Sequence, residues 1–307
     1  MSIRIAGGFA VTEPIRQGYA SYRSAAAALC DFCDEVVIVC GRYEAESEKI
    51  LRDISPKIKV VNTSAWPVDY DYDDMRDHFQ AIFDNTDAEI CLKIDSDCVF
   101  SIDSGRRLRA ILLKNKDIDV FYLGRINYWF GNIFTTTYNR VLYAINRQNL
   151  SDRQITYRID NETGMNIPKF SGEVVENQLT DQRLFPINYN CTFMNRTQIL
   201  AKHRAWVKAR NKLLLRLERH NQIDQTYQYS DRKMLLWFRR YHEKKLAAAY
   251  RNLEAKHPDN MTNLVKNLAS DQWGFSNFRA SNSLARACVV AASHLRMSIN
   301  YSRLKSR

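Results

Sequence analysis

The sequence predicts an α/β protein, with a Rossmann-like mixed sheet flanked by helices and a mostly helical C-terminal extension. Over the first hundred residues, short apolar runs alternate with stretches of helical periodicity, which is typical of strand–helix–strand units. These short runs are apolar on both faces, as in strands that helices cover on both sides. Beyond about residue 200 the periodicity becomes helical, which predicts the extension.

The predicted strands and helices of the N-terminal part follow one another in alternation. The strands cover residues 3–10, 35–41, 58–63 and 89–94. The helices between them cover residues 14–33, 44–54 and 75–86. The helix at 44–54 has an acidic first turn, which suits the positive end of the helix dipole. This order predicts a largely parallel sheet.

The second half of the chain is less regular. Two aromatic-rich runs, at 119–130 and 140–145, are predicted strands. The segment 151–183 is polar and irregular, and we interpret it as active-site loops. Helical patterns cover residues 199–220, 231–257 and 283–294.

Charge divides the chain near residue 200. Of its 307 residues, 1–200 contain 23 basic and 27 acidic residues, whereas 201–307 contain 22 basic and 7 acidic residues, a net charge of +15. We therefore predict two parts: a domain over 1–200 and a basic helical region over 201–307.

The cysteines and the N-terminus predict a cytoplasmic protein. Seven cysteines in a chain of this length do not form a disulfide framework, and the C-x-x-C at Cys30 and Cys33 has no second pair to complete a metal site. We interpret both as packing residues on a helix. No apolar run is long enough to cross a bilayer, and the first residues do not form a secretory signal.

Three loops converge at the carboxyl ends of the predicted strands, where open α/β sheets bind their ligands. They contain Gly7-Gly8, Gly41 with Tyr43, and the pair Asp95 and Asp97. The two aspartates directly follow an apolar strand, where ionised carboxylates repel each other and are costly to bury unless a cation is near. Mg²⁺ and Mn²⁺ are held by one or two carboxylates together with phosphate oxygens and water. The alternative is a solvated turn.

In this setting the stretch EICLKIDSDCVF resembles the D-x-D region of GT-A glycosyltransferases, in particular family-2-like enzymes. The segments CDEVVIVCGRYEAESEKIL, FYLGRINYWF and YNRVLYAI are similar to neighbouring strands of that family, and KHPDNMTNLV to a short segment after its catalytic domain. The resemblance covers roughly residues 3–200, and it implies that the predicted domain over 1–200 is a nucleotide-sugar-binding catalytic domain. It implies transfer of a sugar from a nucleotide diphosphate donor, most simply a UDP- or GDP-sugar, to an acceptor hydroxyl.

The resemblance also implies roles for single residues. Asp97, with Asp95, would hold Mn²⁺ or Mg²⁺ against the diphosphate, and Asp95 would alternatively contact the ribose or sugar. Further donor contacts are expected from Gly7, Gly41, Tyr43 and Arg76. The acceptor hydroxyl needs a carboxylate base. The candidates are Glu162, Asp160, Glu173 and Asp181.

The chain departs from the family pattern at two places. It has no Glu-Asp dipeptide of the kind that supplies the base, and Asn188-Tyr189-Asn190 stands where a subgroup has a histidine-containing segment. Inversion at the anomeric carbon of the sugar is expected only by analogy with the family. Two other functions stay open: a sugar nucleotidyltransferase, and a non-catalytic protein with a vestigial site.

The basic region has three interpretations. Its helices could pack as a lid on the catalytic domain, lie on an anionic membrane, or bind a polyanionic glycan. A membrane contact would suit a lipid-linked or glycan acceptor. No nucleic-acid-binding motif is present, so a nucleic-acid partner is not expected.

Overall fold

The structure is a computed structural model of the whole chain. It describes residues 3–12, 21–41, 45–63, 72–129, 133–150, 156–159, 166–170, 172–189, 196–234 and 258–266. The predictions for Tyr43, Asp160 and Glu162 lie outside these residues, as do the predicted helix at 283–294 and most of that at 231–257.

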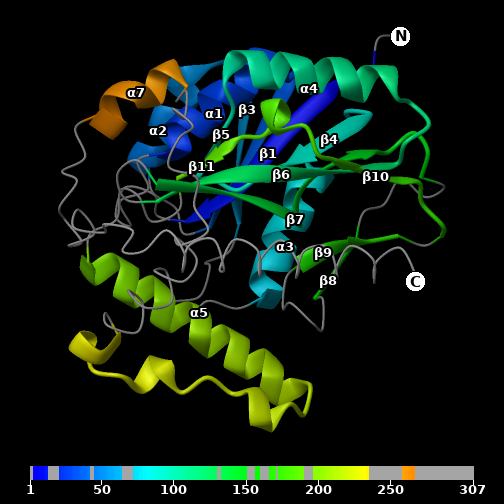
Figure 1. Cartoon of the computed structure of the whole chain (residues 1–307). Coiled ribbons are helices and arrows are strands. Elements are labelled where there is room, and N and C mark those ends of the chain that lie inside the picture. The colour runs from blue at the N-terminus through cyan, green and yellow to red at the C-terminus, as the bar shows by residue number, and fades with distance from the viewer. Residues whose placement is uncertain are drawn as a thin grey trace, which may run out of the picture.

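A mixed sheet forms the centre of the protein (Figure 1). Its strands run in the order β3-β2-β1-β4-β7-β6-β11-β5, and β10 pairs with β6. Their bounds are β1 Ile5–Thr12, β2 Glu35–Gly41, β3 Ile58–Thr63, β4 Ile90–Lys93, β5 Cys98–Val99, β6 Val120–Trp129, β7 Ile133–Asn146, β10 Glu176–Leu179 and β11 Ile187–Asn188. Strands β3, β2, β1 and β4 are mutually parallel, whereas β7 is antiparallel to both β4 and β6.

Helices cover both faces of the sheet, so the predicted fold class is confirmed (Figure 1). They are α1 Ser21–Phe32, α2 Ala45–Ile54, α3 Tyr72–Asp84, α4 Ile102–Lys114, α5 Arg196–Arg216 and α7 Asp259–Lys266. One face packs against α1 and α4, and the other against α3. The strands are apolar on both faces because both faces are covered.

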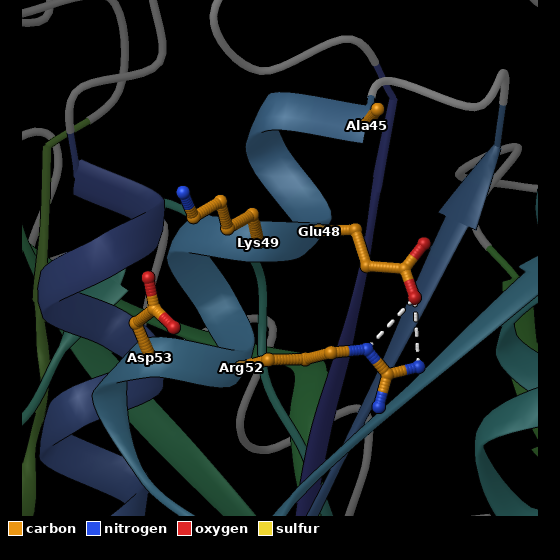
Figure 2. A pocket seen from close by; sticks show the side chains of 5 residues that line it. All are labelled: Ala45, Glu48, Lys49, Arg52 and Asp53. Atoms are coloured by element: carbon orange, nitrogen blue, oxygen red, sulfur yellow. Dashed lines mark hydrogen bonds and ion pairs between the residues drawn. The ribbon is translucent and has the colours of Figure 1, made fainter.

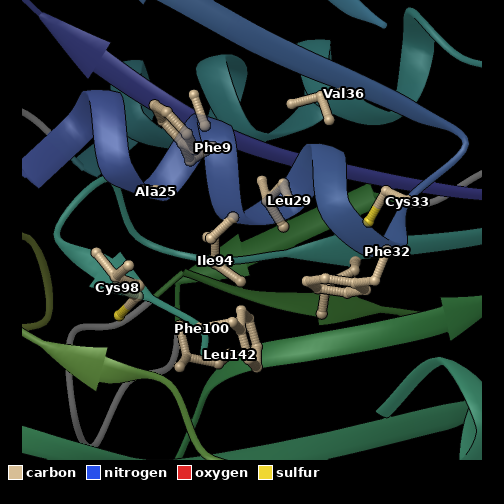
Figure 3. Packing of buried hydrophobic residues seen from close by; sticks show 14 of the residues in the cluster. Phe9, Ala25, Leu29, Phe32, Cys33, Val36, Ile94, Cys98, Phe100 and Leu142 are labelled. Carbon is tan, nitrogen blue, oxygen red and sulfur yellow. The ribbon is translucent and has the colours of Figure 1, made fainter. Parts of the chain in front are cut away.

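The larger core cluster lies between α1 and the sheet, where Leu29 and Phe32 meet Ile94 and Phe100 (Figure 3). The rings of Phe32 and Phe100 pack edge to face, with centroids 5.2 Å apart. Cys33 is buried in this cluster and forms no disulfide. Cys30 is partly buried and packs against the same cluster, in agreement with the predicted packing role. Lys57 Nζ donates to the carbonyl oxygens of both Cys30 and Cys33.

The segment 151–183, predicted to be loops throughout, contains three short strands. β8 Thr156–Ile159 and β9 Asn166–Lys169 form a separate two-stranded sheet, and β10 adds to the edge of β6. These strands are only four residues long and carry polar residues, so they have no clear alternating pattern. Their pairing partners, and not their own periodicity, make them strands.

The position of Gly7-Gly8 corrects a prediction. Both glycines lie inside β1, which continues to Thr12, and not in a loop at the end of the strand. A Cβ at position 7 would lie 2.8 Å from the Leu29 side chain, and one at position 8 would lie 2.6 Å from the Val37 carbonyl oxygen. The glycines therefore allow close packing of helix and strand on β1, which is a structural role.

Gly8→Ala is expected to destabilise the protein by about 1–3 kcal/mol, because the Val37 backbone cannot move aside without disturbing β2. Urea unfolding checks this, with Gly172→Ala as the control. Gly172 is exposed, and a Cβ there would meet nothing within 4 Å. Equal stability of Gly8→Ala and wild type would contradict the packing role.

The basic region begins in a helix that crosses the predicted boundary at residue 200. α5 carries no acidic residue, and its Ala209 and Leu213 pack with Met75 of α3. Further along the chain, Met261 of α7 is fully buried in the larger core cluster. Within the part of the chain that the structure describes, no helix is long and apolar enough to cross a membrane.

Candidate active site

The two aspartates of the D-x-D motif lie in a tight turn between β4 and β5. The Cys98 N–H donates to the Asp95 carbonyl oxygen at 2.9 Å and closes the turn. The preceding residue, Ile94, donates its N–H to the Gly8 carbonyl oxygen at 3.0 Å, which fixes the start of the turn to β1. The aspartates therefore stand on the central strands of the sheet, as the sequence predicts.

Asp95 forms ion pairs with two cations of the protein. Its Oδ1 accepts from Lys93 Nζ at 2.8 Å, and its Oδ2 accepts from Arg125 Nη1 at 2.8 Å. The Lys93 side chain is only 2% exposed and lies over the Phe79 ring, 4.0 Å from its centroid. Asp95 is thus neutralised from both sides by cations that are themselves largely buried.

Asp97 has a different environment. Its Oδ1 accepts from the Asn188 side-chain amide at 2.7 Å, and its carbonyl oxygen accepts from the Tyr189 N–H at 2.8 Å. Among the described residues, no cation forms an ion pair with Asp97 within 4.0 Å. Asp97 is therefore positioned by neutral groups and keeps its charge available.

The two carboxyl groups differ in pKa for the same reason. Burial alone would raise the pKa of Asp95, but Lys93 and Arg125 outweigh it and hold that pKa below its ordinary value. Burial raises the pKa of Asp97, and the negative charge of Asp95 adds to this, against opposition from Lys202 on α5. The ionised form of Asp97 gains from any further positive charge.

The residues fit a hard divalent cation. Asp95, Asp97 and Cys98 each offer a ligand atom, and these atoms lie within 4.8 Å of one another. Burial raises the pKa of the Cys98 thiol to about 12, so it stays protonated, and Asp95 already accepts from two cations. Asp97 is then the carboxylate best placed to bind Mg²⁺ or Mn²⁺, with phosphate oxygens and water as the other ligands.

The residues predicted to contact the donor lie at different places in the structure. Gly41 ends β2, and its carbonyl oxygen accepts from the Thr12 hydroxyl at 2.7 Å, so β1 and β2 end together at the rim. Gly7 lies within β1, as described above. Arg76 lies on α3 and pairs with the exposed Asp77 at 2.8 Å.

Two of the four candidate bases fall on described residues. Glu173 is exposed and precedes β10, whose first residue aligns with the first residue of β6. Because β6 runs parallel to β4, Glu173 stands toward the amino ends of these strands, away from Asp97. Asp181 caps a short 3-10 helix at Gln182–Leu184. Arg183 binds both its oxygens and lowers its pKa.

Lys93 and Asn188 were not among the predicted site residues. Lys93 had a signal in the sequence, because a lysine in an otherwise apolar strand needs an anion as its partner. Asn188 lies 91 residues from Asp97 in the chain, and nothing in the sequence pairs the two. Arg125 lies 30 residues from Asp95 in the chain, and nothing in the sequence pairs these two either.

A separate shallow pocket lies on α2, lined by Ala45, Glu48, Lys49, Arg52 and Asp53 (Figure 2). Glu48 and Arg52 form an exposed ion pair one turn apart, at 2.7 Å. No part of the D-x-D turn lines this pocket.

Comparisons with known proteins found similar solved structures but no match by sequence. No family model and no curated protein matches the chain. Solved structures that resemble it include TarS of S. aureus, with 12% identity, a TM-score of 0.43, and coverage of 73% of this chain and 44% of that one. Another is the mannosyltransferase PcManGT from Pyrobaculum calidifontis in complex with GDP-Man and Mn²⁺, with 10% identity, a TM-score of 0.40, and coverage of 96% and 80%.

A third is glucosyl-3-phosphoglycerate synthase from Mycobacterium tuberculosis with Mn²⁺ and UDP, at 12% identity, a TM-score of 0.34, and coverage of 48% of this chain and 58% of that one. The chain thus spans about half the length of TarS and of the synthase.

Proposed function

We propose that the chain is a metal-dependent glycosyltransferase that moves a sugar from a nucleotide diphosphate donor to an acceptor hydroxyl. The observation that carries this proposal is the pair of carboxylates at the exit of β4. Asp95 is neutralised within the protein, whereas Asp97 faces no described cation at ion-pair distance and is held by Asn188. A rigid, available carboxylate at the ligand-binding rim suits a cation that bridges to a diphosphate.

Each residue then has a stated task in the reaction. Asp97 would hold Mn²⁺ or Mg²⁺, which supplies neutralisation of the charge that grows on the leaving diphosphate. Asn188 keeps the Asp97 carboxylate in one orientation through its 2.7 Å hydrogen bond. Lys202 acts electrostatically on both aspartates, so its positive charge is near enough to attract the phosphates of a donor.

The transfer itself needs a base for the acceptor hydroxyl. The hydroxyl oxygen forms a bond to the anomeric carbon, the bond from that carbon to the phosphate oxygen breaks, and the base takes the proton. Asp181 is poorly suited, because Arg183 lowers its pKa and occupies both its oxygens. The base is therefore proposed to be Asp160 or Glu162, and inversion at the anomeric carbon remains part of the proposal.

A glycan or lipid-linked acceptor and contact with an anionic membrane are proposed from charge alone. α5 does not present one apolar face for a membrane. Its exposed Trp206 and Leu215 are nine residues apart, about two and a half turns, and so point to opposite sides of the helix. The contact would be electrostatic and would weaken with salt.

The products of the reaction test the proposal against its alternatives. We expect release of a nucleoside diphosphate from one nucleotide sugar in the presence of Mn²⁺, with UDP-glucose and GDP-mannose as the first donors to try. The control is the same mixture with EDTA. Release of pyrophosphate from a sugar phosphate and a nucleoside triphosphate would instead identify a nucleotidyltransferase. A protein that releases neither product, over a panel of donors and acceptors, would be a binding protein with a vestigial site.

A further inference from the structure

We propose that Asp95 is a positioning residue and not a ligand of the metal. Together with Lys93 and Arg125 it forms an ion-pair group, named here the Asp95 group, which holds the D-x-D turn and leaves Asp97 as the carboxylate for the metal. This inference rests on the proposed function, which supplies the metal, but its structural half does not depend on it.

Each carboxylate oxygen of Asp95 already accepts a hydrogen bond from a cation of the protein. Oδ1 accepts from Lys93 and Oδ2 from Arg125, each at 2.8 Å. Both cations are largely buried, with side-chain exposures of 2% and 17%. For Asp95 to bind a metal, one of these buried cations would have to give up its ion pair with Asp95, which is costly in the protein interior.

An irregularity in β6 turns the Arg125 side chain toward Asp95. The register between β6 and β7 shifts at Leu123 and Gly124. Before the shift, Phe121 and Leu123 belong to the larger core cluster, and after it Ile126 and Tyr128 do. The alternation of faces is thus inverted at this point, as at a β-bulge, which commonly re-aims a side chain beside an active site.

The inversion places Arg125 on the face where Lys93 lies. Lys93 contacts Phe79 of the smaller cluster, on the α3 side of the sheet. Gly124 permits the irregularity, because a Cβ there would lie 2.4 Å from the Phe185 ring. A regular strand would have turned Arg125 toward the opposite face, away from Asp95.

The Asp95 group joins β4 to β6. β4 and β6 are not neighbours in the sheet, since β7 lies between them. Asp95, at the exit of β4, reaches Arg125 of β6 across that strand. The turn that carries Asp97 is therefore fixed at both ends, by the Asp95 group on one side and by Asn188 and Tyr189 on the other.

The test compares Asp95→Asn, Lys93→Met, the double variant and Asp97→Asn in the full chain. Two quantities are measured: the melting temperature without ligand, and the Mn²⁺ concentration that gives half-maximal binding, by the loss of the free Mn²⁺ electron paramagnetic resonance signal, alone and with UDP or GDP. Asp95→Asn should lower the melting temperature by roughly 6 °C or more, because it removes the negative charge that both buried cations bind. Adding Lys93→Met should recover part of this loss.

The Mn²⁺ measurement separates positioning from ligation. We expect Asp97→Asn to raise the half-saturating Mn²⁺ concentration at least about 30-fold. The increase for Asp95→Asn should be several times smaller, because this variant loses only the second-sphere support of the metal ligand. Equal losses in the two variants, with an unchanged melting temperature for Asp95→Asn, would make Asp95 a ligand and overturn the proposal.

The proposed function and this inference fail in different ways. If the wild-type protein binds no Mn²⁺, with or without a nucleotide, the metal site is contradicted both in the proposed function and in this inference. The melting temperatures still decide the structural half in that case. Strictly additive effects of Asp95→Asn and Lys93→Met would show that the two residues do not act as one group.

Discussion

Asp97→Asn is expected to abolish metal-dependent sugar transfer while the protein stays folded. Neutralisation of a leaving diphosphate by a cation contributes several kcal/mol to the transition state, so the rate should fall on the order of a thousandfold. Asparagine has the same shape, and its carbonyl oxygen still accepts from the Asn188 amide that now binds Asp97 Oδ1. The folded protein should lose no stability, because burial already disfavours the charge of Asp97, as its raised pKa indicates.

The rate is measured as nucleoside diphosphate released per unit time at saturating Mn²⁺, beside the melting temperature of each variant. Ser96→Ala is the matched control, since it changes the same turn without changing its charge. A variant Asp97→Asn that melts like wild type and keeps its rate would remove Asp97 from the reaction. A variant that loses both rate and fold would point to a structural role instead.

Lys93→Met is expected to destabilise the protein by about 3 kcal/mol. Removing one partner of a buried ion pair costs roughly 3–5 kcal/mol, because the other charge stays buried without compensation. The lower end applies here, since Arg125 still neutralises Asp95 from its other oxygen. Methionine keeps most of the volume and its contact with the Phe79 ring, so the loss reports the charge more than the packing.

Urea unfolding monitored by circular dichroism gives the free energy of unfolding for this comparison. Arg52→Gln serves as the control, because the exposed Glu48–Arg52 pair on α2 should contribute about 0–1 kcal/mol (Figure 2). If Lys93→Met were no more destabilising than Arg52→Gln, the buried ion pair would not hold the turn, and the account of Asp95 would be wrong.

The parallel half of the sheet was predictable because its signals are local. Each of β2 and β3 is a β-branched run that ends at a polar or glycine residue, and α3 shows helical spacing on its own. The same local reading failed at Gly7-Gly8, where a pair of glycines looks like a turn. Glycine is needed at these positions because Leu29 and Val37 lie too close to leave room for a Cβ. Both belong to other elements, so the sequence around residue 7 does not show this.

The position of the site was predictable from the sequence, but the contacts between its residues were not. A strand that ends in D-x-D marks the rim, and the structure puts Asp95 and Asp97 there. Their partners come from 30 residues away for Arg125 and 91 residues away for Asn188. Whether Arg125 faces the aspartates depends on one irregularity in β6, which a single glycine in the sequence hints at but does not fix.

The distinction between the two aspartates is likewise a property of the folded chain. Both are carboxylates two residues apart, and the sequence offers either as a metal ligand. Only the contacts of Lys93 and Arg125 show that Asp95 is already satisfied. The same holds for the candidate bases, since the sequence gives no sign that Arg183 occupies Asp181 or that Glu173 stands at the wrong end of the strands.

The most direct test of the central claim is nucleotide binding by the wild-type chain, with and without the metal. Melting curves are recorded with UDP, GDP, CDP and dTDP in turn, each with Mn²⁺ or with EDTA. A nucleotide at a hundred times its dissociation constant stabilises the folded state by roughly 2.7 kcal/mol, which such a curve resolves. We predict a rise with one nucleotide that requires Mn²⁺. No rise with any of the four, or a rise of equal size in EDTA, would contradict a metal-dependent donor site at Asp97.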